Sequence, residues 1–185
     1  HKLQIVKHDP IGTGNACSLW EMHEFSNAVA VINVTYKLGD KKATTSEYKE
    51  KGETYNVNNP YGFTSVVSCT NNGEALAANN GAYSFEITGD ANVVVEIQEN
   101  LPFKTTTITD GNFAAGTEWY FLRQRWNDHY WEHDAADNIV KVKNEGYSLY
   151  EAKQLWCFTG NAIDGFKVYN KAAGATFSLN NASPA

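Results

Sequence analysis

Apolar and polar residues alternate along parts of this chain with the two-residue period of a β-strand. In the segment 28–38 every even position is apolar, while the odd positions from Asn33 to Lys37 are polar. Successive side chains of a strand point to opposite faces, so this pattern predicts a strand with one buried face. The same alternation returns at 83–88 and at 93–97 and predicts two more strands of this kind.

Short turn signals separate these segments. Gly39-Asp40 follows the first strand, and glycine and aspartate are residues that turns favour. Further strands are expected at 41–51, which is polar enough for a sheet edge, and at 54–57 and 63–69. Short strands separated by turns predict a small, Ig-like β-sandwich over residues 26–102.

A second module is expected to begin at Phe103. Pro102 interrupts the strand pattern because proline cannot donate a hydrogen bond to a sheet, and aromatic residues become denser beyond Gly116. Segments 119–126 and 129–134 are predicted to form a hairpin around Asn127-Asp128. Later strands are expected at 154–159, 166–170 and 176–179, with a mildly helical stretch at 149–153.

The composition excludes two classes of partner. Of the 185 residues, 42% are hydrophobic and 19% are charged, which is typical of a folded protein. The net charge is −6, and no run of lysine or arginine could neutralise a phosphate backbone, so nucleic acid is not an expected partner. No apolar run approaches the roughly 18 to 20 residues of a membrane-spanning helix, so no membrane span is expected.

The residues that could hold a metal do not form a metal-binding pattern. Cys17, Cys69 and Cys157 lie far apart and lack CxxC spacing, so they are expected to be buried small side chains, or one disulfide and a leftover thiol. His129 and His133 would lie on the same strand face, on either side of an intervening tryptophan, rather than converge as in a helical HExxH motif. No metal and no cofactor is therefore expected.

The densest group of potential ligand-binding side chains surrounds the predicted hairpin tip. The residues expected to bind a ligand are Trp126, Asn127, Asp128, His129 and Trp131. Aromatic faces stack on the apolar face of a sugar ring, and amide and carboxylate groups hold its hydroxyls. This mixture indicates a carbohydrate site. The alternative is that Trp131 belongs to the core and the polar residues simply solvate the hairpin.

The segment Gln-Leu-Trp-Cys-Phe at 154–158, followed by 165–174, resembles the QxW repeat of ricin-type β-trefoil lectins. The resemblance implies a trefoil-like module over residues 103–185, with Trp156 packed in its core. The lectins usually have Asn immediately before Gln-x-Trp, where this chain has Lys153. The resemblance therefore supports a lectin-like architecture better than it supports a sugar site.

The region holds fewer than the three repeats of a complete trefoil. Ser18–Met22 has an aliphatic residue and a tryptophan at positions matching the QxW segment. Residues 1–25, expected to form N-terminal strands, are then either the tail of an upstream trefoil or a complement to the C-terminal module; chance similarity is the third interpretation. The run from Trp119 onward also resembles accessory modules of secreted gut-bacterial glycosidases and surface proteins.

These observations favour a noncatalytic accessory region of a secreted or cell-surface bacterial protein, with a glycan as ligand and other domains of the same chain as partners. A structural spacer or protein-interaction module is the second hypothesis. A fragment of a glycoside hydrolase is the third, but no pair of carboxylates is singled out by the sequence, and no nucleophile motif is present. The chain is therefore not expected to be an enzyme.

Overall fold

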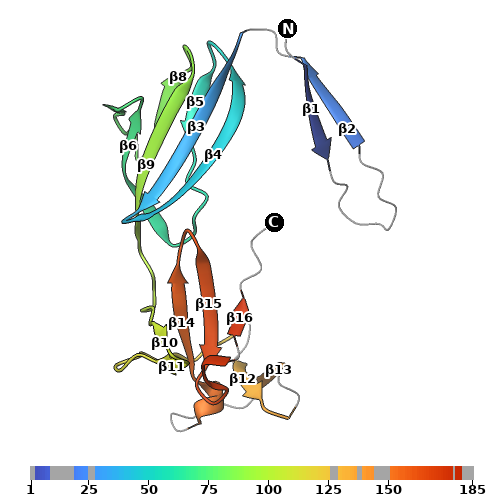
Figure 1. Ribbon diagram of the computed structural model, residues 1–185, viewed down its shortest axis with the longest axis vertical. Coiled ribbons are helices and arrows are strands. Elements are labelled where there is room, and N and C mark those ends of the chain that lie inside the picture. The colour runs from blue at the N-terminus through green and yellow to red at the C-terminus, as the bar shows by residue number, and fades with distance from the viewer. Residues whose placement is uncertain are drawn as a thin grey trace. The chain divides into compact units, whose positions relative to one another are not determined.

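The computed structural model describes residues 3–8, 19–24, 28–125, 129–136, 139–143, 151–176 and 178–180 (Figure 1). Throughout these ranges the regular elements are β-strands and two short 3-10 turns, so the expected all-β fold class is confirmed. Contacts divide the chain into two units, which are described separately. The first unit comprises residues 1–60 and 65–98, and the second comprises 61–64 and 99–185.

A five-stranded sheet is the main element of the first unit. Its strand order is β4-β3-β9-β6-β7. Strand β3 pairs antiparallel with β4 and parallel with β9, and β4 occupies the expected sheet edge. The strands are β3 (Val29–Leu38), β4 (Lys41–Glu50), β6 (Thr64–Asn71), β7 (Glu74–Ala75) and β9 (Ala91–Glu99).

Two smaller sheets complete the first unit. Strand β5 (Thr54–Val57) pairs antiparallel with β8 (Tyr83–Glu86). Strand β1 (Leu3–His8) pairs antiparallel with β2 (Leu19–Glu24), so part of the segment 1–25 is a β-hairpin.

Alternate residues of the two central strands form the core of the first unit. Ile32 is fully buried and Val34 and Val93 are 1% exposed, whereas their neighbours along each strand are more exposed. Burying one face of each strand is the driving force that the sequence alternation indicated. The core side chains are Ala30, Ile32, Val34, Tyr36, Tyr55, Cys69, Ile87, Ala91, Val93, Val95 and Ile97.

The polar residues on the opposite face of β3 bond to one another across strands. Asn33 accepts a hydrogen bond from Ser46 Oγ at 2.6 Å and donates Nδ2 to Asn92 Oδ1 at 3.2 Å. The hydroxyls of Thr35 and Thr44 lie 2.9 Å apart. Such cross-strand pairs stabilise a sheet and its register, which accounts for the polar half of the alternation.

The second unit is built from short antiparallel pairs. Strand β10 pairs with β11, β12 pairs with β13, and β14, β15 and β16 form a three-stranded sheet. The elements are β10 (Ile108–Thr109), β11 (Asn112–Phe113), β12 (Tyr130–Asp134), β13 (Ile139–Lys143), η1 (Ala152–Gln154), β14 (Trp156–Asn161), β15 (Gly165–Asn170), η2 (Gly174–Thr176) and β16 (Ser178–Asn180).

The predicted strand over 119–126 is wrong as a regular element in its described part. Tyr120 bridges to Trp156, whereas Arg123 bridges to Tyr130, so this segment pairs with two different strands a few residues apart. Neither pairing extends into a ladder. Part of the expected pairing across the hairpin is present, since the Gln124 N–H donates to the His129 carbonyl at 2.9 Å.

A partly buried hydrogen bond in the first unit makes the stability of that unit depend on pH. Tyr55 is 8% exposed, and its hydroxyl donates to Glu47 Oε1 at 2.5 Å. Burial, together with this bond to the carboxylate, raises the pKa of Tyr55 well above its usual value near 10. Burial acts to raise the pKa of Glu47 as well, but hydrogen bonds from Tyr55 and Lys49 outweigh it and lower that pKa.

We expect Tyr55→Phe to reduce the free energy of unfolding by about 1 kcal/mol at neutral pH, the usual value of one such bond. The parent protein should lose stability as the pH rises above about 10, because unfolded Tyr55 ionises there while folded Tyr55 keeps its proton. Tyr55→Phe should show a shallower alkaline loss in urea titrations at several pH values. Tyr48→Phe, at a tyrosine that is 53% exposed, is the matched control; an equal effect there would contradict this account.

Candidate functional site

The predicted aromatic hairpin is only partly within the described structure. Trp126, Asn127 and Asp128 lie outside the described residues. His129 and Trp131 are both half-buried. The Trp131 N–H donates to the Leu122 carbonyl at 2.9 Å, which attaches the start of β12 to the segment before the hairpin tip.

Trp131 contacts the fully buried Trp156. The two rings meet edge to face, with centroids 6.4 Å apart, and the Trp156 Nε1–H donates to the Trp131 carbonyl at 3.0 Å. This geometry is favourable for aromatic pairs and satisfies the polar atom of the buried indole. Trp131 therefore packs against its own unit, and its side chain is half-buried.

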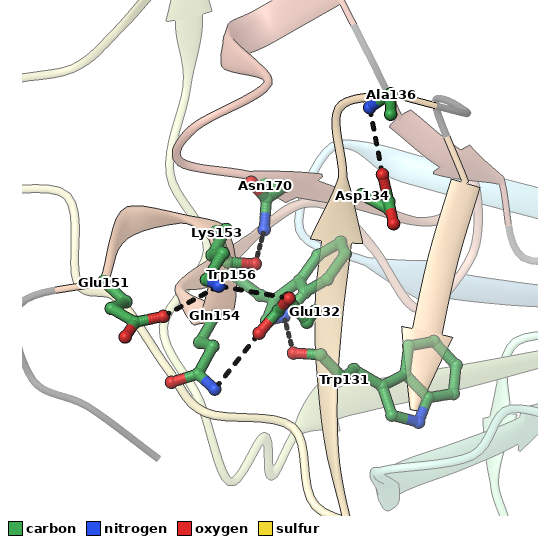
Figure 2. A network of polar contacts seen from close by, with 9 residues as sticks. All are labelled: Trp131, Glu132, Asp134, Ala136, Glu151, Lys153, Gln154, Trp156 and Asn170. Atoms are coloured by element: carbon green, nitrogen blue, oxygen red, sulfur yellow. Dashed lines mark hydrogen bonds and ion pairs between the residues drawn. The ribbon is translucent and has the colours of Figure 1, made fainter. Parts of the chain in front are cut away.

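A buried carboxylate follows Trp131 on the same strand. Glu132 is 8% exposed and points toward Gln154 and Lys153, as Figure 2 shows. Its two oxygens lie 3.2 Å from Lys153 Nζ and 3.4 Å from Gln154 Nε2. Lys153 also lies 3.1 Å from Glu151, and these two carboxylates raise the pKa of the lysine. The network holds β12 against η1 and satisfies the buried charge internally.

A buried asparagine organises the turn after β15. Asn170 is fully buried, and its Nδ2 donates to the carbonyl oxygens of Lys153 at 2.7 Å and of Leu155 at 3.3 Å. Its Oδ1 accepts from the backbone N–H groups of Ala172 and Ala173. One side chain thus ties the end of β15 to the segment that leads into β14, and Figure 2 shows the bond to Lys153.

The cysteines and histidines that the structure describes show no metal site. Cys69 and Cys157 are buried free thiols, and burial raises the pKa of Cys157 to about 11. Cys17 lies outside the described residues. His133 is 6% exposed, and the described part of the chain holds no group of three metal-binding side chains.

An open polar groove lies elsewhere in the second unit, at residues that sequence reasoning did not select. It has a volume of about 280 Å³, near the lower end of ligand pockets, which span about 300 to 1,000 Å³. The groove runs between two segments that flank the β10–β11 hairpin. Its lining consists of Lys104, Thr105, Thr106, Thr107, Ala114, Ala115, Gly116, Thr117 and Glu118.

Two threonine hydroxyls in this lining form a directed chain of hydrogen bonds. Thr117 Oγ1 donates to the Ala114 carbonyl at 2.7 Å and lies 2.7 Å from Thr106 Oγ1. A hydroxyl has a single hydrogen, so Thr106 must be the donor in the bond to Thr117. Both hydrogens are then used within the protein, and both oxygens keep lone pairs that can accept from a ligand.

A charged pair lies at one end of the groove. Lys104 Nζ bonds to Glu118 Oε1, and the Tyr120 hydroxyl donates to Glu118 Oε2 at 2.8 Å while accepting from the Lys104 backbone N–H. The bond to Lys104, and then that to Tyr120, lowers the pKa of Glu118, and the bond to Glu118 raises the pKa of Lys104. The groove therefore presents an oriented, ionised carboxylate beside hydroxyl acceptors.

The sequence shows the polar residues of the groove, but it does not show that they lie opposite one another. Lys104-Thr-Thr-Thr and Gly116-Thr-Glu are rich in hydrogen-bonding groups. They face one another because β10 and β11 form a hairpin, closed by the Ala114 N–H donating to the Thr107 carbonyl at 3.0 Å. A two-residue strand pair is too short to predict from alternation.

No protein-family model, curated protein or solved structure matches this chain. Among the described residues, no helix has the length and apolar character needed to cross a membrane.

We expect Asn170→Ala to reduce the free energy of unfolding by about 2 to 4 kcal/mol, because it removes the partners of several backbone groups, most of them in partly buried surroundings. Asn161→Ala is the matched control. Asn161 Oδ1 also accepts from two backbone N–H groups, those of Ile163 and Asp164, but its side chain is only half-buried. Urea denaturation should show a loss of about 1 kcal/mol or less there. Equal losses in the two variants would contradict the role assigned to burial.

Proposed function

We propose that the second unit is a noncatalytic carbohydrate-binding module whose ligand is a neutral sugar held in the Lys104–Glu118 groove. The observation that carries this proposal is the directed chain from Thr106 through Thr117 to the Ala114 carbonyl, beside the Glu118 carboxylate. These oxygens accept hydrogen bonds, and a sugar presents several hydroxyl donors on adjacent carbons. The Lys104–Glu118 ion pair leaves the groove lining with no net positive charge, so a phosphate or carboxylate ligand would gain no net electrostatic attraction there.

The same lining supports a binding role rather than catalysis. Glu118 is the one carboxylate among the groove's lining residues, whereas glycoside hydrolysis ordinarily uses two carboxyl groups about 5 to 10 Å apart. With the QxW resemblance at Gln154–Phe158, this favours an accessory region of a secreted or cell-surface bacterial protein, with other domains of that chain as its partners.

A spacer remains the second candidate because the described part of the aromatic hairpin serves the packing of its own unit. Glu132 bonds to Gln154 and Lys153, and Trp131 packs on Trp156. A site at the hairpin and a site in the groove are therefore separate hypotheses, and substitutions distinguish them.

In a glycan-array screen followed by calorimetry, we expect binding of neutral glycans. Glu118→Gln should weaken it by about 10-fold to 100-fold, because a hydrogen bond to a charged group is lost. Thr106→Val should weaken binding by about 3-fold to 10-fold. Thr35→Val alters the Thr35–Thr44 hydroxyl pair of the first unit and should leave binding unchanged.

The outcomes separate the hypotheses once each variant is shown to be folded. Binding that is lost in Trp126→Ala or Trp131→Ala, but kept in Glu118→Gln, would place the site at the predicted hairpin and refute the groove. The absence of binding across a broad array would favour the spacer.

A further inference from the structure

Two identical tripeptides in the first unit form turns with nearly the same backbone. Asn71-Asn72-Gly73 and Asn79-Asn80-Gly81 are the two Asn-Asn-Gly sequences of the chain. Their central residues have φ values of 50° and 86° in the first turn and of 50° and 79° in the second. Each turn closes a two-residue loop, through the pairs Asn71–Glu74 and Asn79–Ala82. This is the left-handed pattern for which Asn-Gly is favoured in hairpins.

The two turns differ in what holds the asparagine side chain. Asn72 Oδ1 accepts from the Asn92 backbone N–H at 2.9 Å, and its Nδ2 donates to the Asp90 carbonyl at 3.3 Å. The Asn72 backbone N–H also donates to the Asn92 carbonyl at 2.9 Å. The first turn is thus attached to β9 by both side chain and backbone.

Asn80 shows no such attachment. Within the described residues, no hydrogen bond involves its side chain, and residues 77–82 are all exposed. The turn is closed by the two backbone bonds between Asn79 and Ala82, at 2.8 and 3.0 Å. Segments with few buried contacts and solvent-exposed backbone bonds open locally at low free energy.

We propose that Asn80 is a site of spontaneous deamidation, whereas Asn72 is protected. In this reaction the Gly81 backbone nitrogen forms a bond to Asn80 Cγ, the bond from Cγ to the side-chain nitrogen breaks, and ammonia leaves with the proton from the Gly81 nitrogen. Water then opens the cyclic imide at either carbonyl, giving aspartate or isoaspartate. Gly81 has no side chain to hinder the attacking nitrogen.

The protection of Asn72 follows from the geometry of attack. The side chain must rotate until Cγ meets the next backbone nitrogen. For Asn72 this rotation breaks the bonds to Asn92 and Asp90, and for Asn80 it breaks none among the described contacts. Two hydrogen bonds of ordinary strength slow a step that must break both by about 10-fold to 100-fold.

The product changes the surface of the first unit. Either product places a negative charge at an exposed position that was neutral. Isoaspartate also adds a backbone carbon to the two-residue loop, which disrupts the paired bonds between Asn79 and Ala82. This hairpin tip should therefore acquire charge and lose its turn with time.

The test is incubation of the full chain at mildly alkaline pH, followed by peptide mapping with mass spectrometry, which detects a gain of about 1 Da at each site. We expect conversion at Asn80 to be at least about 10-fold faster than at Asn72 in the folded protein. In urea the two rates should become similar, because the local sequences match. Asn80→Gln should abolish the fast signal.

Equal rates in the folded protein, or faster conversion at Asn72, would overturn the proposal. So would an unreactive Asn80 in the folded chain together with a reactive one in urea, since that would show that the native turn protects this site as well. The expected result is a difference between the sites that exists only when the protein is folded.

Discussion

Hydrogen bonds to one strand, β14, position the segments of the second unit that carry the aromatic hairpin and the candidate groove. Trp156 exchanges two backbone hydrogen bonds with Tyr120, at 2.8 and 2.9 Å, and its indole N–H bonds to the Trp131 carbonyl. Two residues further along, the Phe158 carbonyl accepts from the Thr106 N–H at 2.7 Å. Segments before the aromatic region and within it are therefore hydrogen-bonded to one strand, and a fully buried indole anchors that strand.

These hydrogen bonds determine the geometry of the candidate groove. Thr106 is placed by Phe158, and Tyr120, placed by Trp156, orients Glu118 through its hydroxyl. The hairpin between them brings the Thr106 and Thr117 hydroxyls together. A site whose acceptors are held by a packed strand is preorganised, and preorganisation reduces the ordering cost of binding.

In the first unit, one sheet has an apolar face that packs in the core and a polar face whose side chains hydrogen-bond to one another across strands. Ile32 and Val93 pack in the core, while Asn33 and Asn92 bond across the outer face. Hydrophobic burial supplies the driving force, and the polar pairs stabilise the strand register. The turns at Asn72 and Asn80 differ because Asp90 and Asn92 hydrogen-bond to the Asn72 side chain, whereas no described bond holds the Asn80 side chain.

The sequence by itself determined the all-β class, the alternation of β3 and β9, and the turn at Gly39. These follow from local periodicity and side-chain type, which act within a few residues. Tertiary structure decided the parallel pairing of β3 with β9, the divided pairing of Tyr120 and Arg123, the burial of Glu132, and the meeting of Thr106 with Thr117. Each depends on partners from separate strands or loops, and no local pattern specifies which partner a backbone group or a carboxylate will find.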